Sequence, residues 1–372
     1  MIREKNRKLI LETGEEYSGY AFGAEGSKVV ELVFNTSMVG YQEILSDPSY
    51  TDQAVVMTYP LIGNYGMNRD DNETKTPSVS GMVVRELCQK PSNFRLDQSL
   101  DDVMKKYGIL GLEGIDTRKL TRIIREHGTC RAYITDMATS KEEALRIIRE
   151  TPAWHDAVSR VSSKKKWMMQ SPKPSSEALK VALIDCGVKH NIIRSLVKRD
   201  CDVTIFPYDT PADVIMKSNP HGILISNGPG NPEDVTPVIE LIRELRGKIP
   251  IFGICLGSQM IALAYGAKTY KLHFGHRGGN HPVKDLMTGK IEITSQNHSY
   301  AVDRESLENT ELDMTHYNLL DATVEGVACM KDRCFGIQYH PESAPGPEDS
   351  GYLFDRFIRW MQQYKKEKAG EE

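Results

Sequence analysis

The chain has 372 residues, of which 40% are hydrophobic and 26% charged, and its formal net charge is −4. This is the composition of a globular protein, and it offers no extended positive field for nucleic acid. The length predicts two domains. The charged start of the chain argues against a signal peptide, and no apolar run approaches the roughly 18 residues that span a membrane.

Seven cysteines are spread along the chain, with no Cys-x-x-Cys pair among them. An odd number of cysteines at such spacing argues against a disulfide framework and against a zinc site. We therefore expect reduced thiols, a cytoplasmic location and no metal bound by this chain.

The first part of the chain alternates short β-rich runs with turns and amphipathic segments. It predicts a mixed α+β domain over residues 1–170, which ends in a linker. Asp116 or Thr117 is the expected N-cap of one helix, and Gly128 its stop. Strands are expected at 9–11, 29–34, 54–59 and 81–87, and helices at 40–45, 100–107, 116–126 and 141–150.

A Ser-, Pro- and Lys-rich segment, residues 162–178, marks the boundary between the two parts. Its composition predicts an exposed linker, although Trp167, Met168 and Met169 indicate that part of it packs. A second domain is expected over residues 178–372.

In this second part, apolar strands alternate with helices, which predicts an α/β domain with an open, mostly parallel sheet flanked by helices. The loops at the carboxyl ends of such strands usually carry the functional groups. Strands are expected at 180–186, 202–207, 222–226, 249–254, 290–295, 326–331 and 335–338, and helices at 189–199, 211–218, 236–246 and 352–364.

The stretch from Ile249 to Gln259 reads as a buried strand that turns sharply into a helix, with Cys255 at the turn. It is the cysteine counterpart of a Gly-x-Ser-x-Gly nucleophile elbow. Gly253 and Gly257 would let the strand and the helix pass closely. A sulfur at a helix N-terminus is favoured as thiolate. Cys255 is therefore our candidate nucleophile, although a buried cysteine is more often an inert apolar residue.

A thiol nucleophile needs a base, and the sequence offers His340 with Glu342 two residues further on. In an extended segment both side chains point to the same side, so the carboxylate could orient the imidazole. The alternative is a surface His-Pro-Glu turn. The combination with the Cys255 turn favours the catalytic interpretation.

The loop Asn227-Gly228-Pro229-Gly230 follows the strand before the Cys255 strand. Gly228 and Gly230 can adopt positive φ and leave backbone N–H groups free, which together with the amide of Leu256 could hold an oxyanion. The alternative is an ordinary Gly-Pro turn. A phosphate loop is excluded because no Lys-Ser/Thr follows.

Residues 275–281 contain two histidines among three glycines, with His273 close by. A metal site here is weakly supported, since no carboxylate or thiol completes a ligand set at the usual spacing. A glycine-rich rim of an active site is the better interpretation. The polar run 296–300 follows an expected strand and could reach the same edge.

Gly-Ile-Cys-Leu-Gly-x-Gln, Asn-Gly-Pro-Gly and His-Pro-Glu together resemble the motifs of the class I, triad-type glutamine amidotransferases. Residues 34–38, 40–45, 47–50, 116–120 and 274–283 are also similar to the small, glutaminase subunit of carbamoyl-phosphate synthase. This resemblance covers nearly the whole chain.

The resemblance implies that Cys255 attacks the side-chain amide of glutamine, that His340 acts as the base and that Glu342 orients His340. The resulting ammonia would pass to a large subunit, which makes carbamoyl phosphate from bicarbonate and ATP for pyrimidine and arginine biosynthesis. The resemblance also implies a heterodimer, with further association of heterodimers open, and no cofactor on this chain, since ATP and a divalent metal belong to the large subunit. Glutamine-binding positions are implied at Ser49, Gly228, Gly230, Leu256, Gln259, Asn297, Ser299 and Tyr300.

Two positions depart from the family pattern. Ser258 stands where relatives often have His, and Ser299 stands where glycine is common. Ser299 can still offer a backbone amide to the substrate, provided that its φ is negative.

Three other functions remain open at this stage. They are the glutaminase component of another synthase such as anthranilate synthase, a non-catalytic regulatory scaffold, and a cysteine hydrolase that acts alone on another amide. The long N-terminal part counts against the first. The intact residues at 255, 340 and 342 count against the second.

Overall fold

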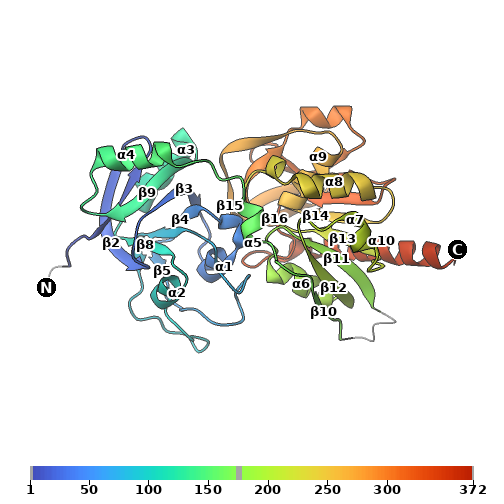
Figure 1. Ribbon diagram of the computed structural model, residues 1–372, viewed down its shortest axis with the longest axis horizontal. Coiled ribbons are helices and arrows are strands. Elements are labelled where there is room, and N and C mark those ends of the chain that lie inside the picture. Colours follow the sequence, from blue (N-terminus) through green and yellow to red (C-terminus); the bar gives the residue numbers. More distant parts are fainter. Residues whose placement is uncertain (1–2, 173–177, 371–372) are drawn as a thin grey trace. The chain divides into compact units, whose positions relative to one another are not determined.

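The computed structural model describes residues 3–172 and 178–370, and the chain forms two compact units (Figure 1). One unit comprises Met1–Trp154 with His273–Arg277, and the other comprises His155–Leu272 with Gly278–Glu372. Residues 173–177 of the expected linker lie outside the described residues. The preceding part of that segment contains β10 (Trp167–Met169), which pairs antiparallel with a strand of the second unit.

The first unit is built on seven strands that close into a barrel of mixed direction. Three neighbouring pairs are parallel, namely β3–β4, β4–β6 and β6–β8, and the other pairs are antiparallel. The expected mixed α+β character is therefore present, but the closure and three of the strands were not predicted. In order around the barrel the strands are β1 (Arg7–Leu11), β2 (Glu16–Gly23), β8 (Leu110–Glu113), β6 (Gly81–Val84), β4 (Gln53–Met57), β3 (Lys28–Asn35) and β9 (Cys130–Asp136).

Helices pack on this barrel through alternate strand residues. One buried cluster joins the strands to α3 (Thr117–His127), and another joins them to α1 (Tyr41–Ser46) and α2 (Leu100–Lys106). Asp116 is the N-cap of α3, since its carboxylate accepts a hydrogen bond from Lys119 N at 2.9 Å, and Gly128 ends the helix at φ 93°. The remaining elements are α4 (Lys141–Glu150), the 3₁₀ turn Pro48–Tyr50, β5 (Leu61–Ile62) and β7 (Glu86–Leu87).

The second unit contains a ten-stranded sheet. Its strands β12, β11, β13, β14 and β19 are parallel, whereas β10 pairs antiparallel with β12 at one end. The strands β18, β16, β15 and β17 continue the other end, where the pairs β19–β18, β18–β16, β18–β17 and β15–β17 are antiparallel. The expected mostly parallel sheet is thus found only at its centre. The strands are β11 (Leu179–Asp185), β12 (Cys201–Pro207), β13 (Gly222–Ile225), β14 (Ile251–Ile254), β15 (Thr269–Asp285), β16 (Ile291–Val302), β17 (Asp313–Asn318), β18 (Val324–Cys329) and β19 (Cys334–Ile337).

Helices cover both faces of the parallel strands, as the near-continuous apolar strand sequences predict (Figure 1). Within β11, Ala182 and Ile184 pack on one face, and Val181 and Leu183 pack on the other. The first face is covered by α7 (Ala212–Met216), α8 (Thr236–Leu245) and α9 (Leu256–Ala264), and the second by α6 (His190–Val197) and α10 (Tyr352–Ala369). A five-residue helix, α5 (Ala157–Val161), precedes β10.

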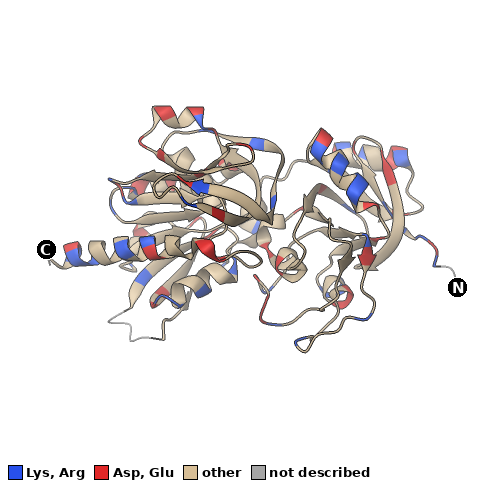
Figure 2. Ribbon diagram, turned by 180° about the vertical axis from the view of Figure 1, so that it is seen from behind, with Lys and Arg blue, Asp and Glu red and all other residues tan. Residues whose placement is uncertain are grey.

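Charged residues of both signs are interspersed on the surface, and Figure 2 shows them alternating along α10. Within the described part of the chain, every helix is too short or too polar to cross a bilayer.

Candidate active site

Cys255 occupies the turn between β14 and α9, at φ 53° and ψ −105°. Positive φ is costly for a residue with a side chain, and such strain is usually found at functional positions. The turn is held by close packing. A Cβ atom on Gly253 would lie 2.6 Å from backbone atoms of Gly257, and one on Gly257 would lie 2.3 Å from the carbonyl oxygen of Ile225. Both glycines of the motif are therefore required for close approach.

The sulfur of Cys255 is buried, with 2% of the residue exposed. The thiol donates to the carbonyl oxygen of Asn297 at 3.6 Å, and the sulfur accepts from Nε2 of Gln338 at 3.6 Å. Three different segments, the turn after β14, β16 and the segment after β19, thus meet at the sulfur.

His340 and Glu342 lie on the segment that follows β19, the neighbour of β14 in the sheet. Nδ1 of His340 lies 2.7 Å from Oε1 of Glu342, and the backbone N–H of His340 donates to Ser295 O at 2.9 Å. The other ring nitrogen, Nε2, is buried and has no hydrogen bond of usual geometry among the described residues, and the Cys255 thiol raises the pKa of the ring. The three residues therefore form a contiguous thiol–imidazole–carboxylate arrangement.

Lys189 is a fourth charged group in this arrangement, and the sequence analysis missed it. Its Nζ lies 2.9 Å from Oε1 of Glu342 and donates to the carbonyl oxygen of Ser343 at 3.0 Å. The residue is 3% exposed. Its position in the short loop between β11 and α6, at the carboxyl end of a parallel strand, is the one sequence signal that could have identified it.

The charges of this cluster shift two pKa values strongly. Burial by itself lowers the pKa of His340, whereas the Glu342 carboxylate and the Cys255 thiol raise it, to about 10. Burial by itself raises the pKa of Glu342, but Lys189 and His340 lower it to about 2. These shifts favour an ionised Glu342 carboxylate and an imidazole that readily takes up a proton, as a base for the Cys255 thiol must.

Three of the other cysteines, Cys130, Cys186 and Cys201, are buried thiols. Burial raises the pKa of Cys186 well above its usual value and raises those of Cys130 and Cys201 to about 12. These thiols stay protonated at neutral pH, which is the behaviour of structural cysteines.

The Asn-Gly-Pro-Gly loop follows β13 and lies next to the Cys255 turn. Gly230 adopts φ 89°, as expected, but Gly228 does not have positive φ. Gly228 is required for another reason. A Cβ atom there would lie 2.1 Å from the carbonyl oxygen of Cys186 and 2.9 Å from the Leu256 side chain. Close backbone approach, rather than a special φ, therefore explains this glycine.

The remaining expected glutamine-binding residues divide between the two units. Gln259 lies on α9, and Asn297, Ser299 and Tyr300 lie on β16. Ser299 is not among the residues with positive φ, so its backbone meets the condition set above. Ser49 lies in the other unit, on the 3₁₀ turn Pro48–Tyr50.

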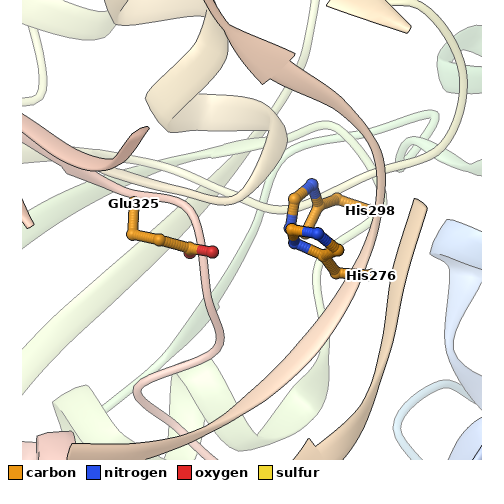
Figure 3. A group of neighbouring side chains, drawn as sticks. All are labelled: His276, His298 and Glu325. Carbon is orange, nitrogen blue, oxygen red and sulfur yellow. The ribbon is translucent and has the colours of Figure 1, made fainter. Parts of the chain in front are cut away.

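A buried network of hydrogen bonds joins residues of β16 to Glu325 on β18. The carboxylate of Glu325 accepts from Nε2 of Gln296 at 3.0 Å, and Oε1 of Gln296 lies 2.9 Å from Nε2 of His298. Nδ1 of His298 lies 2.7 Å from the carbonyl oxygen of Tyr300. Figure 3 shows Glu325 and His298 of this network.

The glycine-rich run 275–281, interpreted above as a rim of an active site, lies within β15, a strand of 17 residues. Backbone pairing explains why it forms a strand, because β15 lies between β16 and β17 in the sheet and such pairing overrides the weak strand propensity of glycine.

Two family models match the chain. The model described as "Carbamoyl-phosphate synthase small chain, CPSase domain" matches residues 9–134, and the one described as "Glutamine amidotransferase class-I" matches residues 182–360. The two matches cover most of the first unit and most of the second.

Curated relatives match over nearly their full length. The carbamoyl phosphate synthase pyrimidine-specific small chain of Halalkalibacterium halodurans is 52% identical over 96% of this chain and 98% of its own. The carbamoyl phosphate synthase small chain of Bacillus cereus is 53% identical over 98% of both chains. That of Fusobacterium nucleatum is 51% identical over 95% of this chain and 98% of its own.

Proposed function

Because the chain belongs to the carbamoyl-phosphate synthase small-chain family, we propose that it hydrolyses glutamine at Cys255 and delivers the ammonia to a large synthetase subunit. The observation that carries this proposal is the buried arrangement of Cys255, His340 and Glu342 at the carboxyl ends of neighbouring parallel strands. The similarity to the pyrimidine-specific small chain of Halalkalibacterium halodurans also supports a role in pyrimidine synthesis.

In the first half of the reaction, His340 takes the thiol proton and the sulfur of Cys255 forms a bond to the side-chain carbonyl carbon of glutamine. The carbonyl oxygen becomes an oxyanion, for which the backbone N–H groups of Leu256 and Gly228 are the proposed donors. His340 then gives its proton to the amide nitrogen, the carbon–nitrogen bond breaks, and ammonia leaves behind a γ-glutamyl thioester.

In the second half, His340 accepts a proton from a water molecule as that water attacks the thioester carbon. The carbon–sulfur bond breaks, the sulfur regains its proton, and glutamate is released. Glu342 keeps the imidazole oriented through both halves, since its carboxylate contacts Nδ1. This chain needs no cofactor for these steps. We assign the ATP and the divalent metal of carbamoyl phosphate synthesis to the large subunit.

We assign glutamine binding to the residues that the family resemblance implies, namely Ser49, Gly228, Gly230, Leu256, Gln259, Asn297, Ser299 and Tyr300. Nε2 of Gln259 donates to protein carbonyl groups, so its Oε1 is the atom available for an amino group of the substrate. We also propose residues 1–170 as the domain particular to this family and 178–372 as the amidotransferase domain.

The proposal is tested by measuring glutamate release with and without the large chain. We expect weak glutamine hydrolysis by this chain alone and strong stimulation by the large chain with its substrates bound. Cys255→Ser should abolish glutamine-dependent carbamoyl phosphate synthesis and leave ammonia-dependent synthesis intact. No glutamine turnover in the wild-type complex, or equal loss of both syntheses in the variant, would contradict the proposal.

A further inference from the structure

The sulfur of Cys255 has a contact that the proposed triad does not use. Nε2 of Gln338 lies 3.6 Å from it. Gln338 is 1% exposed, and its backbone N–H donates to Glu325 O at 2.9 Å. The residue is the first after β19 and lies two positions before His340. It therefore reaches the sulfur from the same segment as the proposed base.

The orientation of the Gln338 amide follows from its second contact. Its other end lies 2.9 Å from Nε2 of Gln259, which also lies 2.7 Å from the carbonyl oxygen of Tyr300. A backbone carbonyl only accepts hydrogen bonds, so this atom of Gln259 must be the NH₂ group. The atom of Gln338 that faces it must then be the oxygen, and the NH₂ group of Gln338 must face the sulfur. A flipped amide would oppose two donors and place oxygen against sulfur.

The contact of the sulfur with Asn297 disfavours the thiolate, whereas the contact with Gln338 favours it. The carbonyl oxygen of Asn297 accepts a hydrogen bond from the protonated thiol at 3.6 Å. Once His340 has taken the proton, that oxygen faces a negative sulfur and the contact becomes repulsive. A hydrogen bond from the Gln338 amide strengthens at the same moment, because donors bind charged acceptors more strongly than neutral ones.

We propose that Gln338 is a further catalytic group, whose amide N–H stabilises the thiolate of Cys255 against the carbonyl group of Asn297, and that Gln259 fixes the orientation of this amide. This inference rests on the proposed function, in which Cys255 is the nucleophile. The titratable groups around the sulfur are His340 and, behind it, Glu342 and Lys189.

The test is the pH profile of Cys255 alkylation by iodoacetamide, followed by peptide mass spectrometry on the complex with the large chain. Gln338→Met keeps the length of the side chain and removes the donor. We expect alkylation near neutral pH to slow about tenfold and its midpoint to move to higher pH. The kcat for glutamine should fall by a similar factor, with KM changed less than about twofold.

Gln338→Glu is the second variant, since it keeps the size and the acceptor for Gln259 but presents an acceptor to the sulfur. The midpoint of its alkylation profile should move to still higher pH. Gln338→Glu also serves as the test if Gln338→Met folds poorly. Gln362→Met, an exposed glutamine on α10, is the matched control and should leave both profiles unchanged.

Profiles of both Gln338 variants that superimpose on the wild-type profile would overturn the inference, even if kcat falls, because the residue would then act through packing alone. Glutamine turnover that survives in Cys255→Ser would contradict the proposed function itself. The two failures are therefore distinguishable.

Discussion

Nζ of Lys189 lies 2.9 Å from Oε1 of Glu342, and the two side chains are 4% and 0% exposed. The same oxygen lies 2.7 Å from Nδ1 of His340. One carboxylate oxygen therefore contacts both the ammonium group of Lys189 and the imidazole of the proposed base. Lys189 offsets the cost of burying the carboxylate, and this keeps Glu342 ionised next to the imidazole.

Lys189→Met should lower the free energy of unfolding by about 3 kcal/mol, because it leaves the buried Glu342 carboxylate without its fixed cation. The measurement is urea unfolding of the variant and the wild type. Lys189→Met combined with Glu342→Gln removes both charges and should recover most of this loss. A double variant no more stable than Lys189→Met would show that the charge of Glu342 is not the cause. Lys217→Met, in an exposed ion pair with Asp213, is the control and should change stability by less than about 0.5 kcal/mol.

Glu342→Gln should reduce the kcat of glutamine hydrolysis about 100-fold or more. Burial and Lys189 lower the pKa of His340, and the Glu342 carboxylate is the largest influence that raises it, so in this variant only the Cys255 thiol would oppose the lowering. The imidazole would then hold a proton less readily for the departing ammonia. The change in KM should be small, since Glu342 is not among the proposed glutamine-binding residues. Steady-state kinetics on the complex check this, and activity above about one-tenth of wild type would contradict the assigned role.

Stability should depend on pH through the same pair. The folded pKa of His340, about 10, lies above its ordinary value of 6.5, so its contribution is fully present below pH 6.5 and is lost as the pH rises toward 10. The folded pKa of Glu342, about 2, lies below 4.5, so its contribution is present above pH 4.5 and is lost as the pH falls toward 2. Thermal unfolding from pH 6 to 10 measures the first effect. The difference between wild type and His340→Asn should shrink across that range, and a constant difference would contradict the raised pKa.

The three proposed catalytic residues could be predicted from the sequence because each belongs to a local pattern. Cys255 lies between two glycines at a strand–helix boundary, and His340 and Glu342 lie two apart in an extended segment. Lys189 and Gln338 lack such patterns. Their contacts to Glu342 and Cys255 join positions 153 and 83 residues apart, so only the sheet order brings them together.

Local patterns likewise predicted one part of the fold and missed another. The parallel strands were predictable because continuous apolar runs such as 181–184 alternate with helices. The barrel closure was not, because β2 and β9 mix exposed and buried residues without a clean apolar run, and their pairing with β1 is set by the folded chain. For β15, its neighbours in the sheet decided the conformation of a glycine-rich sequence.

Gly257→Ala should destabilise the protein and reduce activity together, because the added Cβ would lie 2.3 Å from the carbonyl oxygen of Ile225. Backbone cannot yield as a flexible side chain does, so α9 would have to move away from β13 and carry the Cys255 turn with it. We expect a loss of about 2 kcal/mol or more in the free energy of unfolding and a fall in kcat. Gly279→Ala is the control, since its Cβ would meet its nearest neighbours at 3.7 and 3.9 Å, and it should cost less than about 0.5 kcal/mol. Urea unfolding of both variants measures the loss of stability, and glutaminase assays measure the fall in kcat. Equal stability of the two variants would show that the close approach of Gly257 to β13 is not what fixes the turn.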